Sequence, residues 1–161
     1  MTTQPDRTVY YRRSRFTTHL PVDRRYSAAH YWLLEESAGV WRVGFTKFAT
    51  RMLGDIVEFA FSAAPGAAIA AGDEIGSIEG LKAISSVFSS GTGRFLGAGD
   101  ALVHDVTLAE SDPYGTGWLY RLQGEPGPDT VDVHGYVAIL DATIDKMLAS
   151  RHDAGHEQDE G

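Results

Sequence analysis

The sequence predicts a mostly β protein of two antiparallel sheets with short helices and a C-terminal helix. A hairpin pattern over residues 73–88 places two apolar strands on either side of a glycine-containing turn. Similar segments flank it, at residues 66–73 and 93–100, and 27 residues separate both Gly66 from Gly93 and Gly72 from Gly99. Such a repeat indicates a sandwich with approximate twofold symmetry. Apolar residues at helical spacing near the C-terminus predict a helix that packs on this sandwich.

The remaining elements follow from local patterns along the chain. Thr46 can cap the N-terminus of a short helix, and Gly54 can end it. The glycine-dense stretch 89–99 predicts tight turns. It is not a nucleotide-binding loop, because no Gly-Lys-Ser/Thr follows. In chain order, the predicted elements are strands at 31–34 and 40–43, a helix at 47–53, a strand at 55–61, the hairpin at 73–88, a strand at 118–122 and a helix carrying Val137, Leu140, Ile144, Met147 and Leu148.

Both ends of the chain differ from the middle in composition. Residues 1–25 form an Arg-rich N-terminal extension, which we interpret as a flexible arm. The alternative is a docking segment, because Tyr10, Tyr11 and Phe16 alternate with arginines and could pack on a surface. Acidic residues argue against a mitochondrial transit peptide. Residues 26–150 form the folded domain, and residues 151–161 a flexible, charged tail.

Composition narrows the classes of function. The 161 residues contain no cysteine, so disulfides, thiolate metal sites and a cysteine nucleophile are excluded. A net charge of −8 disfavours nucleic acid as a partner. No apolar run is long enough for a membrane span, which makes the cytoplasm the simplest location. We expect no metal site: a lone histidine pair in the tail, His152 and His156, has no third ligand.

The turn of the hairpin presents one unusual side chain, Lys82. The chain has only three lysines, against eleven arginines, so a high lysine content does not explain a lysine at this position. Gly80 can supply the positive φ that a tight turn often needs, which would leave Lys82 exposed at the apex. An exposed amine on a rigid turn is either a solvated tip or an attachment point for a covalent arm.

Four motifs resemble the glycine cleavage H-protein family, in the family's own order. The resemblance runs from about Tyr26 to Tyr120. The motifs are Glu79-Gly80-Leu81-Lys82-Ala83, similar to the family's Glu-Ser-Val-Lys-Ala; Tyr26…His30-Tyr31-Trp32, similar to its Tyr…His-Glu-Trp; the strand, short helix and strand of residues 43–57; and the Asp-Pro-Tyr-Gly-Thr-Gly-Trp-Leu of residues 112–119.

This resemblance implies a carrier and not an enzyme. The fold would be the lipoyl-domain type, a barrel-sandwich hybrid, and lipoate would be attached to Lys82. Glu79, Gly80, Leu81 and Ala83 would form the hairpin that the lipoate-attaching enzyme recognises. Because a lysine amine has no redox or acyl-transfer activity of its own, the cofactor would carry the chemistry.

Two departures from the family pattern bear on the pathway. The family's acidic residues that line the cleft for the loaded arm correspond here to Tyr31 and Ser86, with His30 beside them. Losing both carboxylates removes charge-assisted contacts to a cationic aminomethyl group. We therefore predict a sulfur carrier, similar to the lipoate-binding branch of the family that serves a heterodisulfide-reductase-like complex in sulfur oxidation.

Two alternatives stay open at this point. One is the H protein of glycine cleavage itself, with glycine decarboxylase, aminomethyltransferase and dihydrolipoamide dehydrogenase as partners. The other is an unmodified interaction module that has lost its arm.

Overall fold

The computed structural model describes residues 7–160, with side chains as far as Arg151. The elements in chain order are β1 (Thr8–Arg13), β2 (Phe16–Pro21), β3 (Arg25–Tyr26), β4 (Tyr31–Ser37), β5 (Val40–Phe45), α1 (Lys47–Leu53), β6 (Ile56–Phe61), β7 (Ala68–Ile69), β8 (Glu74–Gly80), β9 (Ile84–Phe88), β10 (Gly91–Ala98), α2 (Leu108–Ser111), β11 (Tyr120–Pro126) and α3 (Val133–Glu160).

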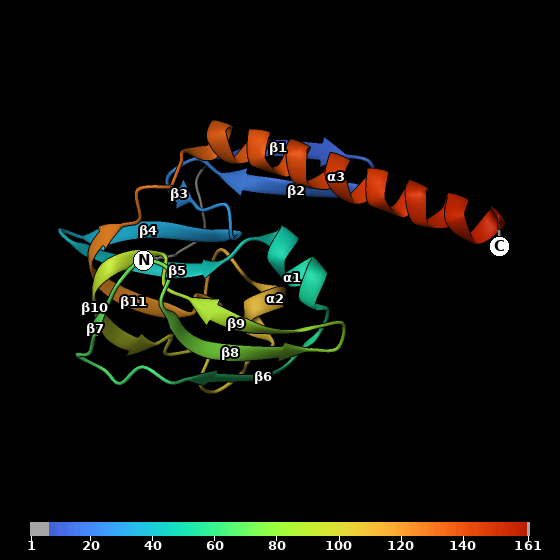
Figure 1. Cartoon of the computed structure of the whole chain (residues 1–161). Helices are drawn as coiled ribbons and strands as arrows, with labels where there is room; N and C mark the ends of the chain where they lie inside the picture. Colours follow the sequence, from blue (N-terminus) through green and yellow to red (C-terminus); the bar gives the residue numbers. More distant parts are fainter. Residues whose placement is uncertain (1–6, 161) are drawn as a thin grey trace.

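Two antiparallel sheets form the body of the protein, which confirms the predicted fold class (Figure 1). One sheet has six strands in the order β3-β4-β5-β11-β10-β7, and the other has three in the order β6-β8-β9. The two repeat segments are hydrogen-bonded neighbours, because Gly93 in β10 pairs with Ile69 in β7. The core between the sheets is apolar and includes Leu33, Val43, Ile75, Ile78, Val87, Phe95, Leu119 and Leu122.

The first three residues of β4 are buried on both faces of the strand, so the molecule has a second core. Tyr31 and Leu33 face the sandwich, whereas Trp32 between them faces α3. On that side the ring of Tyr26 stacks on the ring of Tyr136, with centroids 4.7 Å apart. Leu140 and Ile144 of α3 complete this second core.

The N-terminal extension is folded, so its interpretation as a flexible arm is wrong for residues 7–25. Strands β1 and β2 pair over their whole length and form a hairpin beside α3 (Figure 1). Tyr11, Phe16 and Leu20 are buried in the second core, and the Tyr11 hydroxyl donates a hydrogen bond of 2.8 Å to Asp141 in α3. Two of the three aromatic side chains noted in the sequence, Tyr11 and Phe16, therefore hold the segment on the surface of the domain.

Helix α3 is longer than the apolar pattern predicts. It begins at Val133 and continues to Glu160, through the segment expected to be a flexible tail. Leu140 and Ile144 are buried as predicted, but Met147 and Leu148 are 36% and 41% exposed. The helix thus extends past the surface on which it packs, and its apolar stripe continues into solvent. The side chains of His152 and His156 lie outside the described residues.

Helix α1 has the predicted caps and connects the six-stranded sheet to the three-stranded one. The Thr46 side chain accepts a hydrogen bond from the backbone N–H of Ala49, and the N–H of Gly54 donates to the carbonyl of Thr50. Gly54 has a φ of +76°, which favours glycine at the end of a helix. This ending sets the position of the chain that runs beneath the Lys82 turn.

The motif at residues 112–119 forms a compact turn that supports β4. The Asp112 carboxylate accepts hydrogen bonds from the backbone N–H and the hydroxyl of Thr116. The indole N–H of Trp32 donates to the carbonyl of Pro113, at 2.9 Å. The motif therefore has a structural role between the two cores.

Candidate functional site

Lys82 lies in the three-residue connection between β8 and β9, at the end of the three-stranded sheet (Figure 1). Three backbone hydrogen bonds hold this connection. Gly80 donates to Ala83, Leu81 donates to Asp55, and Lys82 donates to Leu53, each at 2.9 Å. Two of the three reach the end of α1, so the turn is fastened to a helix and is not a free loop.

Gly80 is required at this turn for a reason other than the predicted one. Its φ is not positive, so the expectation that it supplies a left-handed conformation is wrong. A Cβ atom on Gly80 would instead overlap the carbonyl of Leu53. On Gly54, a Cβ would lie 2.8 Å from Cγ of Lys82. The two glycines allow the hairpin tip and the end of α1 to approach closely.

The side chain of Lys82 is exposed, although its backbone is anchored. Among the described residues its amine has no hydrogen-bond or ion-pair partner. Beside it lies a shallow cavity of about 450 Å³, whose lining includes Lys47, Asp55 and Glu110. The flanking Leu81 and Ile84 are 72% and 75% exposed, although both are large and apolar. The turn thus offers a free amine on a rigid base with apolar contacts beside it.

Glu79 and Ala83 complete the turn as the sequence indicated. Glu79 pairs with Ile84 across the hairpin, and its side chain is exposed on the outer face of the sheet. The short Ala83 side chain leaves the lysine unobstructed. Both positions are accessible from solvent.

The structure brings Tyr31 and the strand of Ser86 together. The Tyr31 hydroxyl accepts a hydrogen bond of 3.2 Å from the backbone N–H of Phe88 in β9, two residues beyond Ser86. Tyr31 is buried, and its ring stacks on Phe45. Desolvation raises the pKa of Tyr31, so the hydroxyl is neutral at physiological pH. Tyr31 and Phe88 line a second cavity, of about 430 Å³.

His30 does not belong to this region, although it precedes Tyr31. It has a φ of +71° and directs its ring into the second core. There its Nδ1 lies 2.8 Å from the hydroxyl of Tyr136, and its ring centroid lies 4.6 Å from that of Phe48. Burial lowers the pKa of His30 from 6.5 to about 4. The structure therefore does not place His30 beside Tyr31 and Ser86, because it precedes β4 at a positive φ and its ring packs in the second core.

Carboxylates that the sequence argument missed lie near Ser86 and Tyr31. The Ser86 hydroxyl donates a hydrogen bond of 2.7 Å to Glu74, across the hairpin. Asp129 lines the cavity beside Tyr31. The hairpin register could have revealed Glu74, since it places Glu74 opposite Phe88. Asp129 is distant in sequence and gave no signal. The region therefore has carboxylates at other positions, although Tyr31 and Ser86 themselves are not acidic.

Metal and membrane chemistry find no support in the part of the chain that the structure describes. Within residues 7–151 no three acidic, histidine or cysteine side chains gather as a metal site would require. None of the described helices combines the length and apolar character of a membrane span.

The chain is similar to proteins of one family over most of its length. Residues 24–134 match the family described as glycine cleavage H-protein. The glycine cleavage system H protein of Pseudoalteromonas atlantica is 35% identical over 122 residues, which are 74% of this chain and 94% of the relative. That of Beutenbergia cavernae is 37% identical over 120 residues, 74% of this chain and 95% of the relative.

A solved structure shows the same architecture. The crystal structure of a glycine cleavage system H protein from Mycobacterium marinum superposes with a TM-score of 0.66 at 31% identity. The superposition covers 74% of this chain and 97% of the other. Sequence and fold agree, and the chain belongs to the glycine cleavage H-protein family.

Proposed function

We propose that this protein is the lipoyl carrier of a glycine cleavage system, with lipoate joined to Lys82 through an amide bond. Proteins of this family carry lipoate on a lysine. The observation that carries the assignment is the exposed Lys82 amine, which has no partner among the described residues, on a turn held by three backbone hydrogen bonds. Lys146 lies on α3 beyond the matched residues, and Lys47 is the first residue of a helix.

The residues at the turn fit the cofactor. Amide formation uses only the side-chain nitrogen of Lys82, and the backbone bonds to Leu53 and Ala83 remain intact. The exposed side chains of Leu81 and Ile84 offer apolar contact to an aliphatic arm or to a visiting enzyme. When bound, lipoate supplies a dithiol that carries a one-carbon amine group between active sites. The protein supplies a fixed point of attachment and a surface for its partners.

The relatives favour glycine cleavage over sulfur oxidation. Those described above are named as glycine cleavage proteins, and no comparison supports a heterodisulfide-reductase-like partner. Glu74, bonded to Ser86, gives the surface beside the arm a carboxylate that suits a cationic cargo. The partners would then be glycine decarboxylase, aminomethyltransferase, dihydrolipoamide dehydrogenase and the lipoate-attaching enzyme. A cytoplasmic location is part of the same proposal.

The sulfur-carrier function remains a second candidate because of Tyr31. This neutral, buried phenol occupies a position at which the family has an acidic residue. Tyr31 therefore supplies no negative charge there. A sulfur cargo on the arm is neutral or anionic and does not need that charge.

The attachment site is tested by peptide-resolved mass spectrometry of the protein after incubation with a lipoate-attaching enzyme. We expect the lipoyl group on the peptide that contains Lys82. Lys82→Arg should abolish the modification, whereas Lys47→Arg, in the same cavity, should retain it. Lipoylation of Lys82→Arg would overturn the assignment. A bare Lys82 in protein from the native host would instead favour the unmodified interaction module.

The pathway is tested with the lipoylated protein and glycine decarboxylase. We expect the wild type to be accepted, and Glu74→Gln to raise KM because it removes the carboxylate beside the arm. Glu58→Gln, an exposed carboxylate on β6, is the matched control. If the wild type is rejected and Tyr31→Glu with Ser86→Asp is accepted, glycine cleavage is the wrong pathway. Sulfur adducts on Lys82 peptides during growth on reduced sulfur would then support the second candidate.

A further inference from the structure

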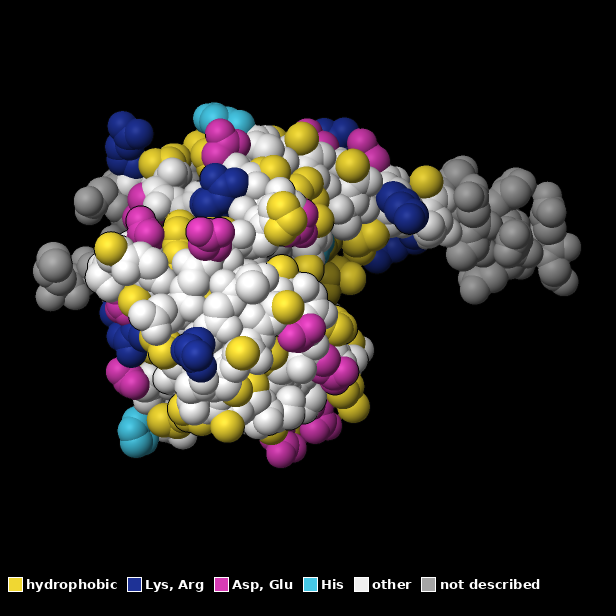
Figure 2. Space-filling model, turned by 60° about the vertical axis from the view of Figure 1, so that its left-hand side comes forward, with side chains coloured by type: hydrophobic (Ala, Val, Ile, Leu, Met, Phe, Trp, Pro, Cys, Tyr) yellow, Lys and Arg dark blue, Asp and Glu magenta, His cyan; other side chains and the backbone are white. Residues whose placement is uncertain are grey.

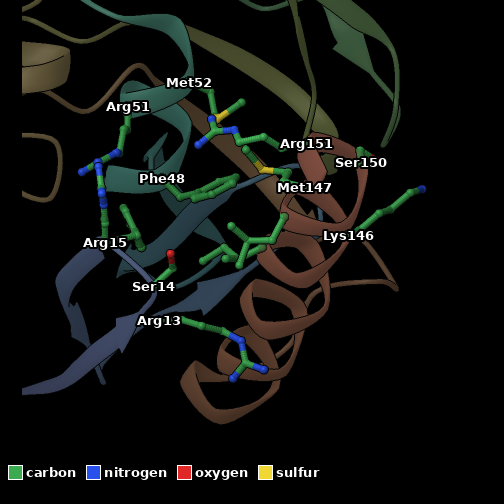
Figure 3. A pocket seen from close by; sticks show the side chains of 13 residues that line it. Arg13, Ser14, Arg15, Phe48, Arg51, Met52, Lys146, Met147, Ser150 and Arg151 are labelled. Atoms are coloured by element: carbon green, nitrogen blue, oxygen red, sulfur yellow. The ribbon is translucent and has the colours of Figure 1, made fainter. Parts of the chain in front are cut away.

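A groove on the far side of α1 from Lys82 is formed by three separate parts of the chain. It lies between the β1–β2 turn, α1 and the middle of α3, and has a volume of about 440 Å³ (Figure 3). We call it the Arg-rimmed groove. Its lining includes residues 13–16 of the hairpin and residues 144–151 of α3, which fall outside the range 24–134 that matches the family. The groove is therefore built largely from segments added to the family frame.

The floor of this groove is apolar and only partly covered. Phe16, Phe48 and Ile144 are buried at its base. Above them Met52, Met147 and Leu148 belong to the large apolar side chains that remain exposed. These three come from two different helices, so the patch is contiguous in space and not in sequence. Methionine side chains are flexible and polarizable, which suits a surface that adapts to another protein.

The rim is basic, and most of its charged groups have no ion-pair partner among the described side chains. Arg15, Lys146 and Arg151 form no ion pair with any carboxylate that the structure describes. Arg13 is the contrast, because both Asp141 and Asp145 neutralise it. On the face shown in Figure 2, basic and apolar side chains lie together where the C-terminal helix leaves the body. In a chain of net charge −8, this gathering of cations runs against the overall charge.

Two guanidinium groups at one side of the groove face each other. The side chains of Arg15 and Arg51 extend toward one another from the hairpin turn and from α1 (Figure 3). The Arg51 guanidinium also lies over the ring of Phe16, 5.7 Å from its centroid. No described carboxylate bridges the two arginines. Like charges held close together without an acid form a site that a carboxylate from outside would stabilise.

The groove is close enough to Lys82 for one partner to contact both. Arg51 lines this groove and also the shallow cavity beside Lys82, so only the width of α1 separates them. A helix with its side chains is about 10–12 Å across. A protein that encloses a Lys82 arm would extend over α1 and reach the groove.

We propose that the Arg-rimmed groove docks an acidic segment of an enzyme that acts on the Lys82 arm, a proposal that depends on the carrier function proposed above. The segment presents apolar side chains to Met52, Met147 and Leu148, and carboxylates to Arg15, Arg51 and Arg151. Charge complementarity selects a protein segment of this kind. The acidic remainder of the chain repels a nucleic acid, and the apolar floor requires side chains that a simple anion lacks.

The test uses the lipoylated full-length protein with charges reversed on the rim. Arg15→Glu with Arg151→Glu changes two groove residues, neither of which lines the cavity beside Lys82. Arg7→Glu with Arg12→Glu is the matched control, because it makes the same charge change in the same N-terminal segment outside the groove. KM and kcat for the carrier are measured with the lipoate-attaching enzyme (on the unlipoylated form) and with each of the three glycine cleavage enzymes, at low and at high salt.

We expect KM to rise about tenfold with at least one enzyme, with kcat unchanged. The rise should shrink at high salt, which screens exposed charges. Met147→Gln, which changes the floor without altering charge, should raise KM with the same enzyme at both salt concentrations. A variant that fails to fold shows a lowered Tm, and Arg15→Gln with Arg151→Gln then replaces it.

Failure of this proposal is distinct from failure of the carrier function. If all enzymes turn over the wild type, and the groove variants keep the wild-type KM with every one, the groove is not a docking site and the carrier function stands. An equal KM change in the control pair also overturns the proposal, because it reports overall charge. If no enzyme turns over the lipoylated wild type, the carrier function fails, and the groove proposal fails with it.

Discussion

The two ends of the molecule present apolar residues in opposite ways. At the Lys82 turn, Leu81 and Ile84 are more than two-thirds exposed, and backbone hydrogen bonds to α1 hold the chain in place. In the layer of β1, β2 and α3, Leu20 and Tyr136 are fully buried, and side chains hold the chain in place. The first region keeps large apolar side chains in solvent, whereas the second buries them. Stability and presentation are thus assigned to different parts of one domain.

This separation predicts the largest loss of stability at Tyr136. Its ring stacks on Tyr26, and its hydroxyl contacts both His30 and Thr46, at 2.8 and 2.7 Å. Tyr136→Ala should lower the free energy of unfolding by about 3–5 kcal/mol, measured by urea denaturation. Tyr136→Phe should cost less, about 1–3 kcal/mol, because only the buried hydrogen bonds are lost. Equal losses in the two variants would show that packing of the ring contributes nothing.

The same substitution at two leucines tests the contrast directly. Leu20→Ala removes a fully buried side chain from the N-terminal hairpin and should cost about 2–5 kcal/mol. Leu81→Ala removes a side chain that is 72% exposed and should change the free energy of unfolding by less than about 0.5 kcal/mol. Leu81→Ala should instead slow lipoylation of Lys82, and Leu20→Ala should not, under conditions where both remain folded. A reversed pattern would contradict the division of roles.

His30, which is buried in the second core, predicts that the free energy of unfolding depends on pH. Its pKa is about 4 in the folded protein and 6.5 ordinarily, because burial disfavours the charged ring. Between these values the unfolded chain binds a proton that the folded chain does not. Stability should therefore be unaffected above pH 6.5 and fall as pH drops from 6.5 to 4, by about 3 kcal/mol in all.

The control for this pH effect is His30→Asn, since asparagine tolerates the positive φ at this position. The variant loses packing against Phe48, so its absolute stability is lower, but the decline between pH 6.5 and 4 should be smaller than in the wild type. Carboxylates titrate alike in both proteins and cancel in the difference. The free energy of unfolding is measured by urea denaturation at each pH. If it falls as much in His30→Asn as in the wild type between pH 6.5 and 4, His30 is not the source of the pH dependence.

How far the sequence predicts the molecule depends on the separation of the interacting residues. The pairing within the Lys82 hairpin and the caps of α1 join residues that are close in sequence, and local patterns predicted them. The contact of Tyr11 with Asp141 joins residues 130 positions apart, and no local signal predicts it. For the same reason the helical stripe indicated which face of α3 is apolar, but not that packing ends at Ile144 and leaves Met147 exposed.

Local patterns also gave wrong predictions at residues whose type fits more than one structural role. His30 and Tyr31 are adjacent in sequence, and the family pattern predicts one cleft for both. The positive φ of His30, just before β4, instead directs its ring into the second core, while Tyr31 faces the first. Gly80 at a turn suggested a positive φ, and the structure shows a close backbone contact instead. In both cases the residue type was informative, and its reason became visible only with the neighbouring element in place.

A substitution at Gly80 tests whether the placement of Lys82 matters separately from the stability of the fold. In Gly80→Ala the new Cβ would overlap the Leu53 carbonyl, so the turn must move away from α1 and stretch the bond from the Lys82 N–H to Leu53. Such overpacking costs about 1–3 kcal/mol. Gly39→Ala makes the same change at a φ of +75° with no atom within 4 Å, and costs about 1–2 kcal/mol through strain alone.

The two glycine variants should therefore be similar in urea denaturation and different in lipoylation. The rate at which a lipoate-attaching enzyme modifies Lys82, followed by mass spectrometry, should fall in Gly80→Ala and stay at the wild-type value in Gly39→Ala. Equal rates in both would mean that the enzyme recognises the residues of the turn in any position. A lower rate in Gly80→Ala alone would mean that it reads the lysine at a fixed place relative to α1. That place is set by close backbone contact, which a residue pattern in the turn does not contain.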